Sequence, residues 1–240
     1  MTFYFPGLGT AVNVAAILFG GLFGLFFGKF LTGNIRQTLQ MSCAVVVIFI
    51  GINGTVSSML NILPSGEIEI VGTMLLTGTL IIGGLVGEIL NIDKKFENFG
   101  VWLRKKFGSE GDNKFVEGFV TASLTVCIGA MAVVGAINDR LLQDCTVLYT
   151  KSVLDLVIIA VMTAGLGKGC IFSCVSVGIF QGTLTLLAGL LQPFMNEIAL
   201  KNLSCIGSVL IFCIGINLMF GNKIRVANLL PALAVAVVWK

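Results

Sequence analysis

Long apolar runs separated by short polar segments dominate the chain. Four of these runs are long enough to cross about 30 Å of hydrocarbon at a rise of about 1.5 Å per residue. They cover residues 7–28, 43–60, 70–90 and 118–138. A fifth run, 152–192, is long enough for two crossings and is interrupted by glycines at 165–169; a sixth covers 203–221, and the last, 226–239, is short. The pattern predicts an all-α, polytopic membrane helical bundle with seven firm spans and a marginal eighth.

Parts of this pattern occur twice. Ile-Gly-Ile-Asn closes one apolar run near the start and another near the end, and the similarity extends along neighbouring segments. The matching segments are 12–22 with 180–190, 50–53 with 214–217, and 68–75 with 224–231. Such repeats are typical of transporters built from two related halves. The sequence therefore predicts a single transmembrane domain, 1–240, with repeat 1 at about 7–90, connecting helices at 91–167 and repeat 2 at about 170–239.

The distribution of charge adds an orientation to this picture. The chain is 56% hydrophobic and 11% charged, against about 25% charged residues in soluble domains. Eleven of the fifteen Lys and Arg residues lie in alternate connections, which the positive-inside rule assigns to the cytoplasm. The N-terminus is therefore expected outside. Because the matching spans lie five apart, the two copies would face opposite ways and form an inverted repeat.

One predicted helix, within 91–110, is amphipathic and does not span. Its apolar residues recur at helical spacing, namely Ile92, Phe96, Phe99, Leu103 and Phe107. Basic residues lie off this stripe, and Trp102 flanks it. These features predict an interfacial helix on the anionic cytoplasmic leaflet. It would serve either as a lipid sensor or gate, or simply as a connector on the membrane surface.

Small residues form two ridges at helical spacing. The first comprises Gly20, Gly24 and Gly28, and the second Thr79, Gly83 and Gly87. Small residues let membrane helices approach closely. The ridges predict tight packing within the chain or between copies of it, so a homo-oligomer is one possible outcome.

Lys151 and Asp155 are charged residues inside a predicted span. If Asp144 caps this helix, the helix runs over 145–166 and crosses the membrane. Asp155 then lies near mid-bilayer, one helical turn from Lys151, and the two side chains can pair. The pair would either fix the register of the helix or supply charge to a substrate or a coupled proton.

Uncharged polar residues occupy matching positions in the two copies. Asn13 corresponds to Gln181, and Asn53 to Asn217. A pseudo-twofold axis could bring these amides to one central site, to which Thr55, Thr183 and Asn228 could contribute. The alternative is that the amides only join neighbouring helices. The predicted substrate-binding residues are Asn13, Asn53, Gln181, Asn217, Thr55, Thr183 and Asn228, with Lys151 and Asp155 for charge or coupling.

Several kinds of chemistry are disfavoured by the sequence. The chain has no His, which removes His-based zinc sites and Ser-His dyads. The glycines at 165–169 lack the spacing of a phosphate-binding loop. The seven Cys are scattered, mostly within apolar runs, where Cys behaves as a small hydrophobic residue. We expect no enzymatic activity, no metal, no cofactor and no nucleic-acid partner.

Segments along the whole chain resemble the YdfK/YqgA-type family of bacterial inner-membrane proteins, a domain of unknown function. The segments are 115–124, 148–155, Gln181-Gly182, 214–217 and 228–231. The resemblance implies a polytopic plasma-membrane protein that is sometimes described as a transporter, without an established substrate or catalytic residue. Ala130 stands where many relatives are expected to have Pro, and a straighter fourth span would follow.

These expectations combine into one functional hypothesis. The chain is predicted to be a secondary transporter, or a channel-like carrier, for a small polar solute or ion in the bacterial plasma membrane. Its partners would be the lipid bilayer and that solute. The rival hypothesis is a membrane scaffold or regulatory subunit that transports nothing.

Overall fold

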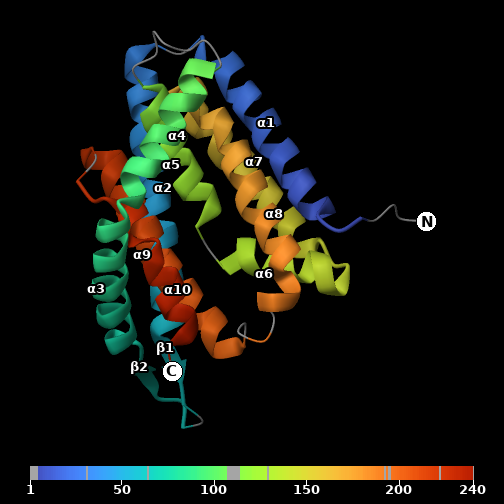
Figure 1. Ribbon diagram of the computed structural model, residues 1–240. Helices are drawn as coiled ribbons and strands as arrows, with labels where there is room; N and C mark the ends of the chain where they lie inside the picture. Colours follow the sequence, from blue (N-terminus) through green and yellow to red (C-terminus); the bar gives the residue numbers. More distant parts are fainter. Residues whose placement is uncertain are drawn as a thin grey trace. The chain divides into compact units, whose positions relative to one another are not determined.

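The computed structural model describes residues 5–30, 32–63, 65–106, 114–128, 130–191, 193, 196–221 and 223–239, and these residues are nearly all helical. The elements are labelled in Figure 1. In chain order they are α1 (Leu8–Gly28), α2 (Gly33–Met59), β1 (Leu60–Ile62), β2 (Ile68–Ile70), α3 (Thr73–Leu90), α4 (Ile92–Lys106), α5 (Phe115–Cys127), α6 (Ala130–Leu142), α7 (Thr146–Leu166), η1 (Lys168–Phe172), α8 (Ser173–Leu191), α9 (Glu197–Phe220), η3 (Val226–Leu229) and α10 (Pro231–Val238).

Five helical segments in the described chain are long and apolar enough to cross a membrane: α1, α3, α7, η1 with α8, and α9. The bent pair α5 and α6 would make a sixth. Two further expected spans correspond to shorter apolar helices, Ala44–Met59 and Val226–Val238. The first of these would extend about 24 Å, less than the roughly 30 Å of a hydrocarbon core. The count of seven or eight spans is therefore not confirmed.

The fourth predicted run is not straight. Helices α5 and α6 differ in direction by 60°, which corrects the expectation drawn from the absence of Pro at position 130. Ile128 lies outside both helices, and the segment 115–142 contains no proline. A span can therefore bend without proline.

A short antiparallel hairpin, β1 with β2, corrects the all-α expectation in a small way. Leu60 pairs with Ile70 and Ile62 with Ile68. Gly66 at the turn has φ +85°, a backbone conformation that glycine adopts without steric cost. Ile68, Glu69 and Ile70 alternate as a strand requires, and β2 takes in Ile70, the first residue of the predicted span 70–90.

Contacts divide the chain into two compact units. The first contains α1, the start of α2, α4 from Phe96, α5, α6 from Met131, α7, η1 and α8. The second contains α2 from Ala44, the hairpin, α3, α9, η3 and α10. Each unit therefore combines helices from both predicted repeats.

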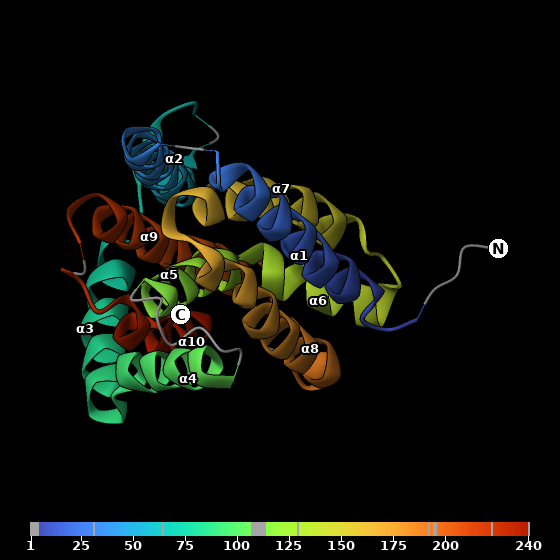
Figure 2. The ribbon, with the colours of Figure 1, turned by 90° about the horizontal axis from the view of Figure 1, so that it is seen from above.

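In the first unit, α1 lies along α7 and also contacts α8, as Figure 2 shows. The ridge of small residues makes this closeness possible. A methyl group on Gly20 would overlap the carbonyl oxygen of Leu156, and one on Gly24 would overlap that of Ala160. Gly28 lies against Ala164 less tightly, since a methyl group there would come within 3.3 Å of the Cα atom of Ala164. The ridge predicted from sequence therefore packs inside the chain.

The amphipathic helix α4 packs its apolar stripe against α5 in the first unit. Leu103 is buried with Phe115 and Phe119, and the rings of Phe99 and Phe119 meet edge to face at 5.7 Å. Trp102, beside the stripe, is half exposed and stacks on Phe99. The helix itself is confirmed, while Phe107 lies outside the described residues.

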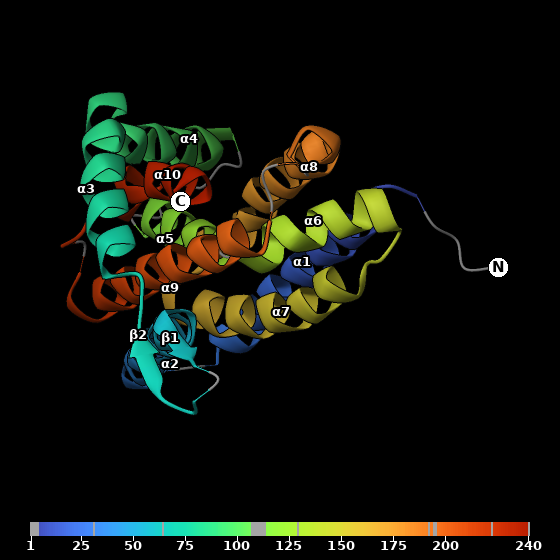
Figure 3. The ribbon, with the colours of Figure 1, turned by 90° about the horizontal axis from the view of Figure 1, so that it is seen from below.

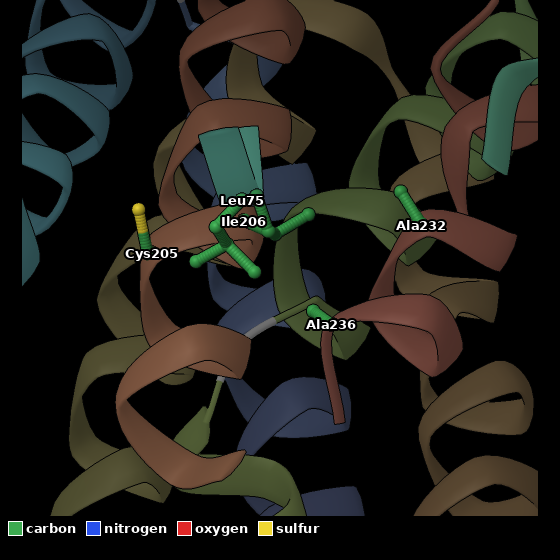
Figure 4. Packing of buried hydrophobic residues seen from close by; sticks show 5 residues of the cluster. All are labelled: Leu75, Cys205, Ile206, Ala232 and Ala236. Carbon is green, nitrogen blue, oxygen red and sulfur yellow. The ribbon is translucent and has the colours of Figure 1, made fainter. Parts of the chain in front are cut away.

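In the second unit, α10 packs against both α3 and α9, and Figure 3 shows α3 from the side of the hairpin. Five buried residues form the core, which Figure 4 shows from close by: Leu75, Cys205, Ile206, Ala232 and Ala236. The second ridge makes the contact possible, because side chains at Gly83 and Gly87 would overlap the backbone of Ala232 and Asn228.

Candidate functional site: a buried polar cluster

Lys151 and Asp155 form a buried ion pair one turn apart on α7. The Lys151 ammonium donates to both carboxylate oxygens of Asp155, at 2.9 Å to Oδ1 and 2.7 Å to Oδ2. Lys151 is 7% exposed and Asp155 3%. Asp155 lies about 13 Å along a helix about 31 Å long. The predicted pairing is present, and both charges lie deep in an apolar helix.

Two amides from other helices complete what we call the polar cluster: Asn13, Lys151, Asp155 and Gln181. Asn13 of α1 donates from Nδ2 to Asp155 Oδ2 at 3.0 Å and, more weakly, to Gln181 Oε1 of α8 at 3.4 Å. Asn13 and Gln181 are completely buried. These two residues occupy matching positions in the internal sequence repeat, and the structure places them in contact.

The antiparallel packing of α1 and α8 positions the amides. Gly21 lies against Ile171 of η1, which leads directly into α8, and Gly178 of α8 faces Val14. Residue numbers therefore rise along one helix as they fall along the other. This register leaves Asn13 opposite Gln181, while the glycine ridge of α1 holds α7 close enough for Asp155 to reach Asn13.

Three polar atoms near the cluster's residues are buried without a hydrogen-bond partner in the described part of the chain. They are Asn13 Oδ1, Gln181 Nε2 and Thr10 Oγ1. Thr10 lies one turn before Asn13 on α1. A buried polar group without a partner costs about 1–3 kcal/mol. Thr10 is not among the predicted site residues, because no local pattern in the sequence indicates that its side chain is buried.

Three of the predicted substrate-binding residues do not belong to the polar cluster. Thr183 is on α8 but is exposed. Asn53 is also exposed, on α2 in the second unit, and its helix continues unbroken to Met59. Thr55 donates to the carbonyl oxygen of Gly51 within the same helix at 2.8 Å.

Asn217 and Asn228 also belong to the second unit, where hydrogen bonds occupy both side chains. Asn217 donates to the carbonyl oxygen of Ile224 at 2.7 Å and accepts from the backbone N–H groups of Lys223 and Ile224. Asn228 donates to Glu88 at 2.6 Å and accepts from the backbone of Asp93 at 2.7 Å. These hydrogen bonds hold the chain in place at the C-terminal ends of α9 and α3.

Replacing Asn217 by Ala is expected to lower the free energy of unfolding by about 1–3 kcal/mol, because three hydrogen bonds that hold the 217–224 turn are lost. Asn53→Ala is the matched control at the corresponding repeat position. Since Asn53 is exposed, a change within about 0.5 kcal/mol is expected there. Thermal unfolding in detergent measures both. Equal losses for the two variants would contradict the assigned roles.

The second unit contains a pocket of about 430 Å³ near the hairpin. Its polar side chains are Ser58, Thr73, Lys201 and Asn202, and the rest of its lining is largely apolar. Asn202 donates to the carbonyl oxygens of Ala236 and Trp239 at 3.2 and 3.1 Å. None of the residues predicted to bind substrate lines this pocket.

Two further carboxylates hold helix starts in the first unit. Asp139 of α6 is completely buried and accepts from the backbone N–H groups of Gly7 and Gly9, at 3.3 and 3.0 Å. Asp139 directly follows the apolar run 118–138, a position from which a side chain could reach the membrane surface, but its carboxylate is buried instead. Asp144 accepts from Thr146 N at 2.9 Å. Hydrogen bonds from Thr146 lower the pKa of Asp144 below its ordinary value, so it stays ionised at the start of α7.

The polar cluster is electrically neutral as a whole, because Lys151 and Asp155 compensate each other. Within the described residues, no group of three or more His, Cys, Asp or Glu side chains is arranged to hold a metal ion. What the cluster offers a ligand is hydrogen bonding from amides, at a depth where water is scarce.

The apolar helices and the buried polar cluster are those of a multi-pass membrane protein. A family model described as "Protein of unknown function (DUF554)" matches residues 8–240, and the chain belongs to this family. The resemblance noted from the sequence is thereby confirmed.

Two relatives match along nearly their full length. One is "Uncharacterized membrane protein YdfK" of Bacillus subtilis (strain 168), 27% identical over 95% of this chain and 93% of the relative. The other is "Uncharacterized protein YqgA" of Escherichia coli (strain K12), 26% identical over 95% of this chain and 94% of the relative. No solved structure matches the chain significantly.

Proposed function

We propose that the chain is a secondary transporter, or a channel-like carrier, that moves a small polar solute or ion across the bacterial plasma membrane by alternating access. The relatives come from bacteria, and one of them is named a membrane protein. The proposed substrate site is the polar cluster, with Asn13 and Gln181 as its binding residues. An enzymatic role is not proposed.

The observation that carries this proposal is the polar cluster itself. A buried charge pair and two buried amides are costly inside a membrane helix bundle and are a common feature of substrate and ion pathways. Hydrogen-bonding atoms of Asn13 and Gln181 remain unpaired among the described residues. A cluster that only joined helices would be expected to satisfy its own atoms.

An inverted repeat is part of the proposal, and reciprocal contacts support it. In a twofold arrangement, residue i of one copy touches residue j of the other, and j touches i. With 50–53 matched to 214–217, Ile48 corresponds to Phe212 and Gly51 to Gly215. Side chains added at Gly51 and Gly215 would meet Phe212 and Ile48, each within 3 Å.

The other matched helices are also antiparallel neighbours. Asn13 contacts its own counterpart, Gln181, which is expected only close to a twofold axis. In the second unit, Gly83 lies against Ala232 and Gly87 against Asn228, so α3 and α10 run in opposite directions. Opposite directions are what an inverted copy requires.

The proposed topology has the N-terminus outside and seven or eight crossings. It rests on the excess of Lys and Arg in alternate connections. It requires the segments 44–59 and 226–238 to act as short spans, and a membrane that thins locally can accommodate a short hydrophobic segment. Labelling of single introduced cysteines from either side of the membrane tests this orientation.

The transport proposal is tested by replacing Asn13 with Leu in protein reconstituted into liposomes. A panel of ions and metabolites is first screened for ligands that raise the melting temperature of the native protein. Flux of a ligand found in this way is expected to fall at least about tenfold in Asn13→Leu, the equivalent of about 1.4 kcal/mol. Val12→Ala, on the exposed side of the same helix, is the control. Undiminished flux in Asn13→Leu would remove the cluster from the pathway.

A membrane scaffold or regulatory subunit is the second candidate, and one observation favours it. All four residues of the polar cluster are at most 7% exposed, as in a sealed bundle. Against it, both ridges of small residues are occupied by contacts within the chain, so neither is free to bind a partner. Absence of any stabilising solute in the screen would favour the scaffold.

A further inference from the structure

The hydrogen bonds of the polar cluster bear on the class of solute. Asp155 accepts two hydrogen bonds from Lys151 and one from Asn13, so both of its oxygens are engaged. Lys151 in turn directs its ammonium at this carboxylate. Each charge is compensated by the other at a separation of 2.7 Å. Neither is available to a ligand unless the pair separates.

The atoms that remain are uncharged. Asn13 Oδ1 is an acceptor, Gln181 Nε2 is a donor, and the Thr10 hydroxyl can act as either. All three are buried and have no partner among the described residues. Asn13 Nδ2 already donates to Asp155 and to Gln181 Oε1. The atoms of the two amides that have no partner are therefore Asn13 Oδ1 and Gln181 Nε2.

These atoms suit a ligand that both donates and accepts hydrogen bonds and carries no net charge. A dehydrated Ca²⁺ or Mg²⁺ would find one amide oxygen and one hydroxyl, whereas these cations take about six or more oxygen ligands. An anion would have one amide donor and the Thr10 hydroxyl. Either ion would remain largely unpaired in a medium where isolated charge is very costly.

We propose that the polar cluster selects small uncharged solutes with a hydrogen-bond donor and an acceptor, such as amides and polyols, and rejects free ions. This inference rests on the proposed transport function and narrows its substrate class. In this view Lys151 and Asp155 do not touch the solute. Their role is to hold Asn13 so that its oxygen, and not its nitrogen, faces the ligand.

The experiment compares neutral and charged probes in proteoliposomes. Labelled urea and labelled glycerol form the neutral arm, and Na⁺ and chloride form the charged arm. Gln181→Met removes the free donor with little change in side-chain length, and Gln181→Glu replaces it with an acceptor. Thr183→Ala, on an exposed position two residues along the same helix, is the matched control. Gel filtration and melting temperature establish that each variant is folded.

The expected result is uptake of at least one neutral probe above that of empty vesicles and no uptake of ions. Uptake should fall about tenfold in Gln181→Met and in Gln181→Glu, as for loss of one buried hydrogen bond, and remain unchanged in Thr183→Ala. Two variants with different chemistry keep the test decisive if one of them fails to fold.

Three other results would overturn the inference in different ways. Uptake of Na⁺ or chloride that depends on Gln181 means that transport stands but the solute is an ion. Neutral uptake that is equal in native protein and both Gln181 variants means that the solute passes elsewhere. No uptake of any probe, together with no stabilising ligand in the wider screen, removes the transport function and this inference with it.

Discussion

Replacing Gly24 by Leu is expected to prevent the first unit from folding. The side chain would have to occupy space that the backbone of Ala160 fills, and a carbonyl group within a helix cannot turn away as a flexible side chain can. Even the single methyl group of Gly24→Ala should cost about 1–3 kcal/mol through overpacking. This loss is expected although Ala favours helix by about 1 kcal/mol relative to Gly. Recovery of monodisperse protein and its melting temperature in detergent are the measurements.

Gly189→Ala is the control for this prediction. A methyl group on Gly189 of α8 would meet no atom of the described chain within 4 Å, so a neutral or slightly stabilising effect is expected. Gly20→Ala should resemble Gly24→Ala, because both positions face the same stretch of α7. A Gly24→Leu protein that folds and melts like the native one would show that α1 and α7 are not packed through this ridge.

The second large effect concerns the ion pair. Lys151→Met and Asp155→Leu should each destabilise the protein by about 3–5 kcal/mol, because each leaves one buried charge without its partner. The double variant should recover most of this loss, since replacing a buried pair with apolar residues of similar size is often neutral or stabilising. Unfolding of all three proteins in one detergent gives the coupling between the two positions.

The double variant also separates structure from function. If the pair only fixed the register of α7, the restored protein would transport as the native protein does. Under the role proposed for it, Asn13 loses its hydrogen-bond acceptor on Asp155, and solute flux should fall in the double variant despite restored stability. Full flux together with restored stability would mean that the pair has only a structural role in α7 and takes no part in transport.

Most helices could be predicted from the hydrophobic pattern because each is built around a single continuous apolar run. The first run, the break near Gly167 and the helix that carries Lys151 and Asp155 agree with α1, the α7–η1 boundary and α7. The bend between α5 and α6 was missed because the apolar run 118–138 continues through it, and hydropathy carries no signal for a change of direction. The hairpin was missed because its strands have three residues each, too few for a periodicity to stand out from the flanking apolar runs.

The residues of the candidate site also divide into those that the sequence could predict and those that it could not. Spacing along one helix was sufficient to pair Lys151 with Asp155, because residues four apart share a helix face. Repeat matching was sufficient to associate Asn13 with Gln181. The same reasoning placed Asn53 and Asn217 in the site. In the structure Asn53 is exposed and Asn217 binds its own turn, because the direction in which a side chain faces depends on neighbours that no local pattern specifies.

By itself, the sequence determined that this is a membrane protein of apolar helices, one of which carries two charged residues. Hydropathy and helical period are local properties of the chain and can be read without the fold. The tertiary structure decided which polar atoms meet and which remain unpaired. Those outcomes depend on how closely α1, α7 and α8 approach and in which register, and both are set by contacts between residues more than 130 positions apart.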